Sequence, residues 1–260
     1  MKERTLTALA IIAGVIPLFF SEEYLYLLVL MISFAIALEL NDLISDNKYP
    51  LIVGLTFAMI TSIGLDFIAS GDKLMVIMIF LIIFVLFDLV YNEIGFNNLS
   101  ILYSVSLLVG FAMNAFISLY AMSTLFVWYI LIVTYGSDTG AYLIGSRFGK
   151  NKLIPKISPN KTVEGAIGGV VVGGTLGLSF ALLTLQTDNI LLLVLISYGI
   201  PMLAQLGDLF FSSLKRLFNK KDFGTLFPGH GGVLDRIDSL IFSLVFIVIF
   251  LRIGYISFFI

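Results

Sequence analysis

The sequence predicts an all-α, polytopic integral membrane protein with about nine transmembrane helices and a polar site that faces the cytoplasm. The composition and the spacing of apolar runs support this fold class. Of the 260 residues, 59% are hydrophobic and 12% are charged, whereas soluble domains are roughly 45–50% apolar and about 25% charged. A soluble fold of this size would expose much of that apolar surface to water. A lipid bilayer is therefore the expected surrounding.

The apolar runs give the expected helices in chain order. A transmembrane helix needs roughly 20 mostly apolar residues to cross about 30 Å of hydrocarbon. The first run is short, which is compatible with a partly interfacial position, and the sixth and eighth carry polar residues. No small-residue cleavage site follows the first run, so it is expected to be an uncleaved span rather than a signal peptide. The nine runs cover residues 5–20, 24–41, 51–70, 74–91, 99–120, 123–145, 165–185, 190–214 and 237–258.

Positive charges predict the orientation of these spans, because cytoplasmic loops are enriched in lysine and arginine. Basic residues precede the first span and fill the loops between spans six and seven and between spans eight and nine, and with nine spans all three groups fall on one side. We therefore expect a multi-pass protein of the cell inner (plasma) membrane, with its N-terminus and active-site loops cytoplasmic and its C-terminus outside. The residues concerned are Lys2, Arg4, Arg147, Lys150, Lys152, Lys156, Lys161, Lys215, Arg216, Lys220, Lys221 and Arg236.

Polar residues are unevenly distributed along the chain. We expect one continuous membrane domain with an N-terminal scaffold at 1–120 and a C-terminal catalytic part at 121–260, because nearly all polar signal lies in 136–238. The absence of cysteine excludes disulfides, thiolate metal sites and cysteine nucleophiles.

Asp138 lies inside an otherwise apolar run, and an ionisable residue within a span is a functional candidate because burying it in lipid is costly. The alternative is that Asp138 lies near the cytoplasmic end and pairs with a basic loop residue. Downstream, Ser158, Lys161, Thr162 and Glu164 lead into the seventh span, where backbone amides, hydroxyls and a lysine suit phosphate. The alternative there is an ordinary positive loop.

Glycines recur at every fourth position of the seventh span, at Gly165, Gly169, Gly173 and Gly177. Small residues at this spacing share one helix face and allow a neighbouring helix to approach closely. The stripe predicts helix packing rather than catalysis.

Carboxylates and basic groups alternate near the ends of the last two spans. Asp208 and Lys215 share a helix face, and Asp235 and Asp238 open the ninth span three residues apart. Such carboxylates beside basic groups suit magnesium bound to a polyphosphate. Helix capping with a local ion pair is the alternative for Asp235 to Asp238. His230, the only histidine, lies between glycines, where a positioning role is preferred to catalysis.

These residues resemble the phosphatidate cytidylyltransferase (CDP-diacylglycerol synthase) family over roughly 130–240. The upstream match covers Asp138 to Tyr142, Gly149-Lys150 and Ser158 to Gly165, although the family often has lysine at the position of Asn160. The C-terminal match is carried by Ser212, Lys215, Arg216, Lys221, Asp222, Gly224, Pro228, His230, Gly231, Gly232, Asp235, Arg236 and Asp238.

The resemblance implies that CTP and phosphatidate give CDP-diacylglycerol and pyrophosphate, in a homodimer that uses Mg²⁺, with K⁺ as a candidate second cation. Membrane lipid is the other expected partner, and no nucleic acid is expected. The expected metal ligands are Asp208, Asp235 and Asp238, with Asp138 beside them. The expected catalytic residues are Asp208, Lys215, Asp235 and Asp238. The expected substrate-binding residues are Ser158, Lys161, Thr162, Glu164, Arg216, Lys221, Asp222, His230 and Arg236.

Two other kinds of function fit parts of the pattern. A CTP-dependent polyprenol kinase or an archaeal-lipid cytidylyltransferase would share the nucleotide and metal chemistry and change the lipid. A transporter or channel would use Asp138 and Asp208 as ion-pathway residues, but such a pathway should spread its acids through the bilayer, toward the midplane. Here the acids are expected at one cytoplasmic face.

Overall fold

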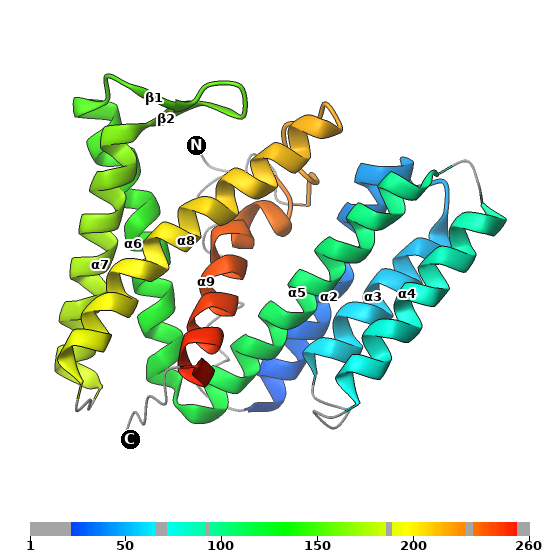
Figure 1. The fold of residues 1–260 in the computed structure, drawn as a ribbon, viewed down its shortest axis with the longest axis horizontal. Helices are drawn as coiled ribbons and strands as arrows, with labels where there is room; N and C mark the ends of the chain where they lie inside the picture. Colours follow the sequence, from blue (N-terminus) through cyan, green and yellow to red (C-terminus); the bar gives the residue numbers. More distant parts are fainter. Residues whose placement is uncertain (1–21, 66–71, 92–93, 186–188, 227–230, 254–260) are drawn as a thin grey trace. The chain divides into compact units, whose positions relative to one another are not determined.

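The computed structural model describes residues 22–65, 72–91, 94–185, 189–226 and 231–253 (Figure 1). The first predicted span, at 5–20, lies outside these residues. Within the described ranges the chain forms eight helices and one two-stranded hairpin. In chain order they are α2 (Glu22–Ser45), α3 (Pro50–Gly64), α4 (Lys73–Val90), α5 (Phe96–Met122), α6 (Thr124–Phe148), β1 (Lys152–Ile154), β2 (Ser158–Thr162), α7 (Val163–Thr184), α8 (Ile190–Leu217) and α9 (Leu234–Ile253).

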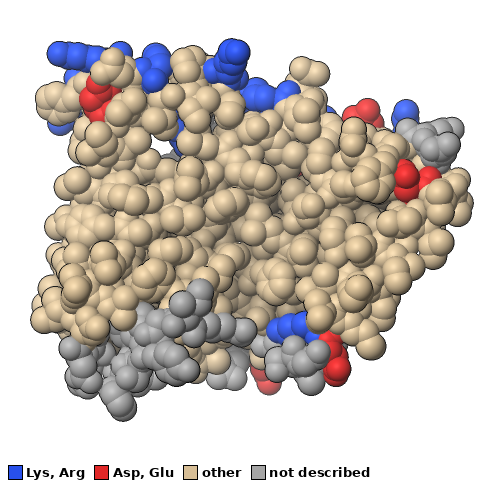
Figure 2. Space-filling view, in the orientation of Figure 1, with Lys and Arg blue, Asp and Glu red and all other residues tan. Residues whose placement is uncertain are grey.

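The helices carry the character expected of a multi-pass membrane protein. Five of those in the described ranges, α2, α4, α5, α7 and α8, are long and apolar enough to cross a bilayer. Along α4, large apolar side chains such as Leu74 and Leu89 are exposed, as on a helix that faces lipid. In Figure 2, uncharged side chains cover the flanks of the helices, while lysine and arginine gather over the hairpin. The helical, multi-pass fold is confirmed, whereas nine spans and their orientation stay predictions.

The hairpin β1–β2 departs from the predicted all-α fold, in which residues 146–164 form a loop between two spans. Lys152 pairs with Thr162 and Ile154 with Ser158, in antiparallel register. The turn closes where the Ile157 N–H donates to the Ile154 carbonyl at 3.1 Å. The strands are short, and their residues, Lys152–Ile154 and Ser158–Thr162, are mostly polar. They therefore lack the alternating apolar pattern that identifies a strand in a sequence.

The chain divides into two compact units. Unit 1 contains Met1–Ile117 and Phe218–Arg236, and therefore most of α5 together with α2, α3 and α4. Unit 2 contains Ser118–Leu217 and Ile237–Ile260, and therefore α6, the hairpin, α7, α8 and most of α9. The segment 218–236, expected in the C-terminal part, thus packs with the N-terminal helices.

In unit 2, helix α7 packs against α6 through its glycine stripe. A Cβ added at Gly173 would lie 2.7 Å from the Val133 carbonyl oxygen and 2.9 Å from the Ser137 Cβ. A Cβ at Gly169 would lie 2.7 Å from the Ser137 carbonyl oxygen. The prediction that this stripe serves helix packing is confirmed, because only hydrogen side chains leave room for the α6 backbone.

Candidate functional site

Three carboxylates from three helices of unit 2 act on one another electrostatically. They are Asp138 on α6, Asp208 on α8 and Asp238 on α9, and together they form the three-acid cluster. The charge of Asp208 acts on both Asp138 and Asp238. Asp138 also accepts a hydrogen bond from the side chain of Ser239. Like charges held together in an apolar helix bundle are costly, so this arrangement calls for a positive partner.

Helices α8 and α9 come close enough to form the cluster because position 207 has no side chain. A Cβ at Gly207 would lie 2.9 Å from the Asp238 carbonyl oxygen and 2.9 Å from the Phe242 Cβ. Asp208 follows directly, so its carboxylate leaves α8 beside the first turns of α9. The close packing therefore brings Asp208 and Asp238 together.

Basic groups from the hairpin and from α8 balance the three-acid cluster. The Lys161 ammonium, on β2, forms an ion pair with Asp208 Oδ2. Ser212 donates to Asp208 Oδ1 at 3.1 Å. Lys215, of which only 8% is exposed, acts electrostatically on Asp238. The structure thus brings five expected site residues together in unit 2: Asp138, Lys161, Asp208, Lys215 and Asp238.

Gln205 fixes α8 against the two glycine-packed helices, one turn before Asp208. Its side-chain amide donates to Ser137 Oγ at 3.2 Å and to the Ala166 carbonyl at 3.0 Å. One side chain therefore connects α6, α7 and α8. Because Ser137 directly precedes Asp138, this contact connects the segments of α6 and α8 that carry Asp138 and Asp208.

The hairpin residues expected to bind substrate also hold the local backbone. Thr162 caps α7 by accepting from the Gly165 N–H at 3.1 Å. Glu164 accepts from the backbone N–H groups of Lys150 and Asn151, at 3.1 and 3.2 Å. These contacts fix both ends of the hairpin, and Ser158 pairs within it.

Arg216 connects the end of α8 to the tip of the hairpin. Its Nε donates to the Ile157 carbonyl at 3.4 Å, and the residue is exposed. The side chains of Arg147, Lys150 and Lys152 are exposed nearby along the chain. This end of unit 2 is therefore strongly positive, as anionic substrates require.

The other expected site residues that the structure describes lie in unit 1, on the segment 218–236, and are Lys221, Asp222, Asp235 and Arg236. Asp235 Oδ2 accepts from the backbone N–H groups of Phe223 and Gly232, at 2.8 and 2.9 Å. Asp235 therefore holds the local backbone, in addition to its expected role as a metal ligand. Lys221, Asp222 and Arg236 are exposed, and His230 lies outside the described residues.

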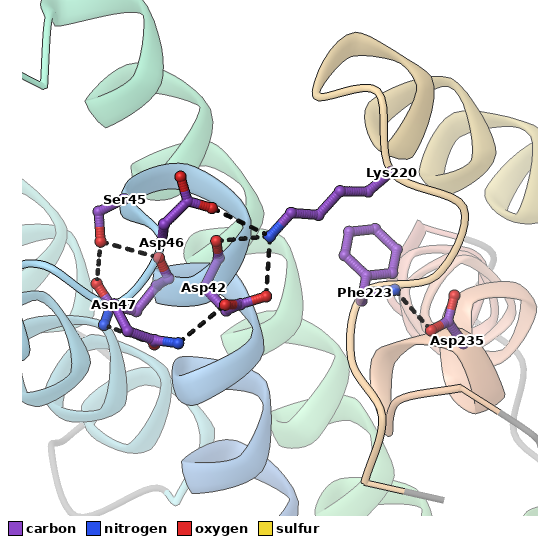
Figure 3. A network of polar contacts seen from close by, with 8 residues as sticks. Asp42, Ser45, Asp46, Asn47, Lys220, Phe223 and Asp235 are labelled. Atoms are coloured by element: carbon purple, nitrogen blue, oxygen red, sulfur yellow. Dashed lines mark hydrogen bonds and ion pairs between the residues drawn. The ribbon is translucent and has the colours of Figure 1, made fainter. Parts of the chain in front are cut away.

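Figure 3 shows how Lys220 reaches from this segment to the end of α2. Its ammonium lies 2.8 Å from Asp42 Oδ2, donates to the Asp42 carbonyl at 2.8 Å, and lies 3.6 Å from Asp46 Oδ1. The contact joins residues 178 positions apart. It attaches the basic segment to a helix that was predicted to be scaffold.

Glu39 is the residue of this region that sequence reasoning missed. It is 7% exposed and its carboxylate accepts from the backbone N–H groups of Val233 at 2.6 Å and Leu234 at 2.9 Å. The available signal was the same one that identified Asp138, an ionisable residue inside an apolar run. No other residue of the apolar run at 24–41 carries a recognised motif, so the sequence gives no second indication for Glu39.

The three-acid cluster offers the oxygen ligands that magnesium prefers. Among the described residues, no three Asp, Glu or His side chains are already grouped as a metal would require. Magnesium usually binds through one or two carboxylates and completes its shell with water and substrate phosphate oxygens. The donor chemistry of Asp208 and Asp238 fits that kind of site, in which phosphate supplies further ligands.

Comparisons with known proteins agree on one family. A model of the cytidylyltransferase family matches residues 2–254. A phosphatidate cytidylyltransferase of Staphylococcus epidermidis is 34% identical over 253 residues, covering 94% of this chain and 96% of that protein. One of Staphylococcus aureus is 33% identical over 256 residues, with the same coverage. One of Bacillus subtilis is 39% identical over 162 residues, covering 60% of this chain and 58% of that protein. The resemblance noted in the sequence is thereby confirmed.

Proposed function

Because the chain belongs to the cytidylyltransferase family, and so is a nucleotidyltransferase, we propose that it transfers the cytidylyl group of CTP to phosphatidate. The observation that carries the choice of phosphatidate is the similarity to relatives with that name along 94% of this chain. The products are CDP-diacylglycerol, a precursor in phospholipid biosynthesis, and pyrophosphate.

The proposed reaction needs positioning and charge stabilisation more than a protein nucleophile. A phosphate oxygen of phosphatidate attacks the α-phosphorus of CTP, a new P–O bond forms, and the bond to the β-phosphate breaks as pyrophosphate leaves. Negative charge then moves onto the leaving group, and fixed positive charges lower the barrier to this step. Lys161 and Lys215, beside the three-acid cluster, are suited to that task. Arg216, Lys221 and Arg236 are proposed to bind further phosphate oxygens.

We propose that Asp208 and Asp238 hold magnesium, with Asp138 beside them. Bound there, magnesium would neutralise phosphate charge. Lys161 already pairs with Asp208, so it is placed to exchange that contact for a phosphate oxygen when the substrate enters. Asp235 is retained as a candidate ligand, and K⁺ as a second cation, in the same proposal.

The experiment uses the full chain, purified in detergent and supplied with CTP and either phosphatidate or a polyprenol. We expect CDP-diacylglycerol from phosphatidate, no phosphorylated polyprenol, and loss of turnover when magnesium is chelated. K⁺ is tested by replacing it with Na⁺. Failure to form CDP-diacylglycerol would refute the proposed substrate, and product from the polyprenol would favour the related kinase. Turnover that survives chelation would refute the magnesium proposal alone.

The proposed orientation places the N-terminus and both basic loops in the cytoplasm and the C-terminus outside. Contacts within each unit support it. Lys220 lies beside Asp42 in unit 1, and Arg216 beside Ile157 in unit 2, so loops predicted to share a side do contact each other. The chain has no cysteine, so single cysteines introduced at Lys156 and Asp72 report sidedness directly. We expect an impermeant thiol reagent to label Asp72→Cys in intact cells and Lys156→Cys only after lysis.

Homodimer formation is part of the same proposal. Its test is the mass of the protein in detergent, measured by light scattering with the detergent contribution subtracted. A mass of one chain would refute it.

A further inference from the structure

We propose that Glu39 is a positioning residue for the reaction, acting through the backbone that carries Asp235 and Arg236. The inference rests on the proposed function for its catalytic consequence, but its structural basis is independent of the substrate. Glu39 lies on α2, in the half of the sequence that shows no other recognised chemistry.

Two carboxylates bind three consecutive backbone N–H groups where α9 begins. Gly232 donates to Asp235 Oδ2 at 2.9 Å, Val233 to Glu39 Oε1 at 2.6 Å, and Leu234 to Glu39 Oε2 at 2.9 Å. The first N–H groups of a helix have no partner inside the helix and attract negative charge. At the start of α9 the carboxylates of Glu39 and Asp235 accept these hydrogen bonds. The three amides are therefore not open to a substrate phosphate in this structure.

The glycines around Glu39 leave the room that its carboxylate occupies. A Cβ at Gly232 would overlap the Glu39 carboxylate, and a Cβ at Gly224 would lie 2.9 Å from Glu39 Cγ. Gly231 has a φ of +85°, and a Cβ there would also lie 2.8 Å from Asp235 Oδ2. Glu39 and Asp235 thus account for three of the glycines that make this segment recognisable in the sequence.

The same segment carries groups that we propose for phosphate binding. Arg236 follows Asp235 directly, and its backbone N–H donates to the Val233 carbonyl at 2.9 Å. The residue that accepts this bond is therefore itself held by Glu39. Asp235 also reaches back to the Phe223 N–H, next to Lys221 and Asp222. Loss of Glu39 should release the start of α9 and misplace Arg236, without removing any charge that contacts substrate.

The test compares Glu39→Gln with a matched control, Asp46→Asn, in the full-length protein. Glutamine keeps the size of Glu39 but turns one acceptor oxygen into a donor that faces a backbone N–H. Asp46 is exposed and has a φ of 47°, a conformation that asparagine adopts readily. The control therefore makes the same carboxylate-to-amide change at an exposed residue just after α2.

The structural readout is amide hydrogen exchange followed by mass spectrometry. We expect exchange at Val233 and Leu234 to rise by about tenfold or more in Glu39→Gln, from the loss of a hydrogen bond to a charged acceptor. Exchange in α4 should not change, and Asp46→Asn should match the wild type throughout. Unchanged exchange at Val233 and Leu234 would overturn the inference.

The kinetic readout separates positioning from general destabilisation. We expect kcat/KM for CTP to fall by about tenfold to a hundredfold, with a higher KM for CTP, because a misplaced phosphate-binding group costs transition-state and substrate binding together. Glu39→Asp, which keeps the charge, should recover part of both exchange protection and activity. Wild-type kinetics in Glu39→Gln, or a fall in kcat alone that follows the unfolded fraction, would overturn the positioning role.

The two proposals fail in different ways. If the wild type makes no CDP-diacylglycerol, the proposed function fails, while the exchange experiment still decides whether Glu39 holds the start of α9. If the wild type is active and Glu39→Gln exchanges faster but keeps normal kinetics, the proposed function stands and the catalytic consequence of Glu39 is refuted.

Discussion

Replacing Gly173 by alanine tests whether the glycine stripe of α7 determines the packing of unit 2. The new Cβ would lie 2.7 Å from the Val133 carbonyl oxygen, against an ordinary contact of at least 3.4 Å. The opposing atom is backbone and cannot rotate away, so α6 and α7 must separate locally by about 0.7 Å, which a close-packed interior resists. Overpacking of this kind costs about 1–3 kcal/mol.

The matched control is Gly54→Ala on α3, where nothing lies within 4 Å of the added Cβ. Both changes gain the same helix propensity of up to about 1 kcal/mol, so their difference reports the packing cost. At about 2–4 °C per kcal/mol for a chain of this size, Gly173→Ala should melt about 2–12 °C below Gly54→Ala. The assay is thermal unfolding of both proteins in the same detergent. Equal melting temperatures would refute the argument that the close packing of α6 and α7 requires glycine at position 173.

Three further substitutions test the polar contacts. Asp208→Asn removes the partner of Lys161, and we expect turnover to fall by about a hundredfold or more in a protein that remains folded, measured as CDP-diacylglycerol formation and melting temperature. Lys220→Met breaks the pair with Asp42, and we expect a loss of about 0–1 kcal/mol, seen as a melting shift below about 4 °C, because the pair is partly exposed. Glu164→Gln weakens a carboxylate that binds two backbone N–H groups, and we expect about tenfold faster amide exchange at residues 150 and 151.

Each of these has a clear contrary outcome. Wild-type turnover in Asp208→Asn would remove that residue from the site. A Lys220→Met protein that fails to fold would show that the pair is worth far more than its exposure suggests. Unchanged exchange in Glu164→Gln would show that other contacts hold the start of the hairpin.

The helices follow from local sequence because crossing lipid is a local requirement. Each apolar run must satisfy its own backbone hydrogen bonds, so the runs at 74–91 and 190–214 predicted α4 and α8 within a few residues. The hairpin at 152–162 was not predicted, because it lies outside the apolar runs and its short strands have no periodic apolar face.

The candidate site was predicted in part for the same reason. The sequence identifies Asp138 as an acid inside an apolar run, and Asp208 and Asp238 as acids near the ends of apolar runs. The structure shows that the three interact in unit 2. Asp235 was grouped with them by its spacing of three residues from Asp238. The structure adds that Asp235 accepts hydrogen bonds from the Phe223 and Gly232 backbone N–H groups, which no spacing rule indicates, and its role as a metal ligand stays a prediction.

The sequence by itself determined the helical membrane fold, the positive loops and the family, because hydropathy, charge and motif spacing are properties of short segments. Only the tertiary structure decided which segments meet: Glu39 with the start of α9, and Asp208 with Asp238 across Gly207. Such pairings depend on the shape of each helix face, because a glycine, which has no Cβ, lets the backbone of a neighbouring helix come closer. They also depend on buried N–H groups that must find an acceptor wherever the fold supplies one. Neither the shape of the facing helix nor the position of a buried N–H group can be predicted from the residues on one side of the contact alone.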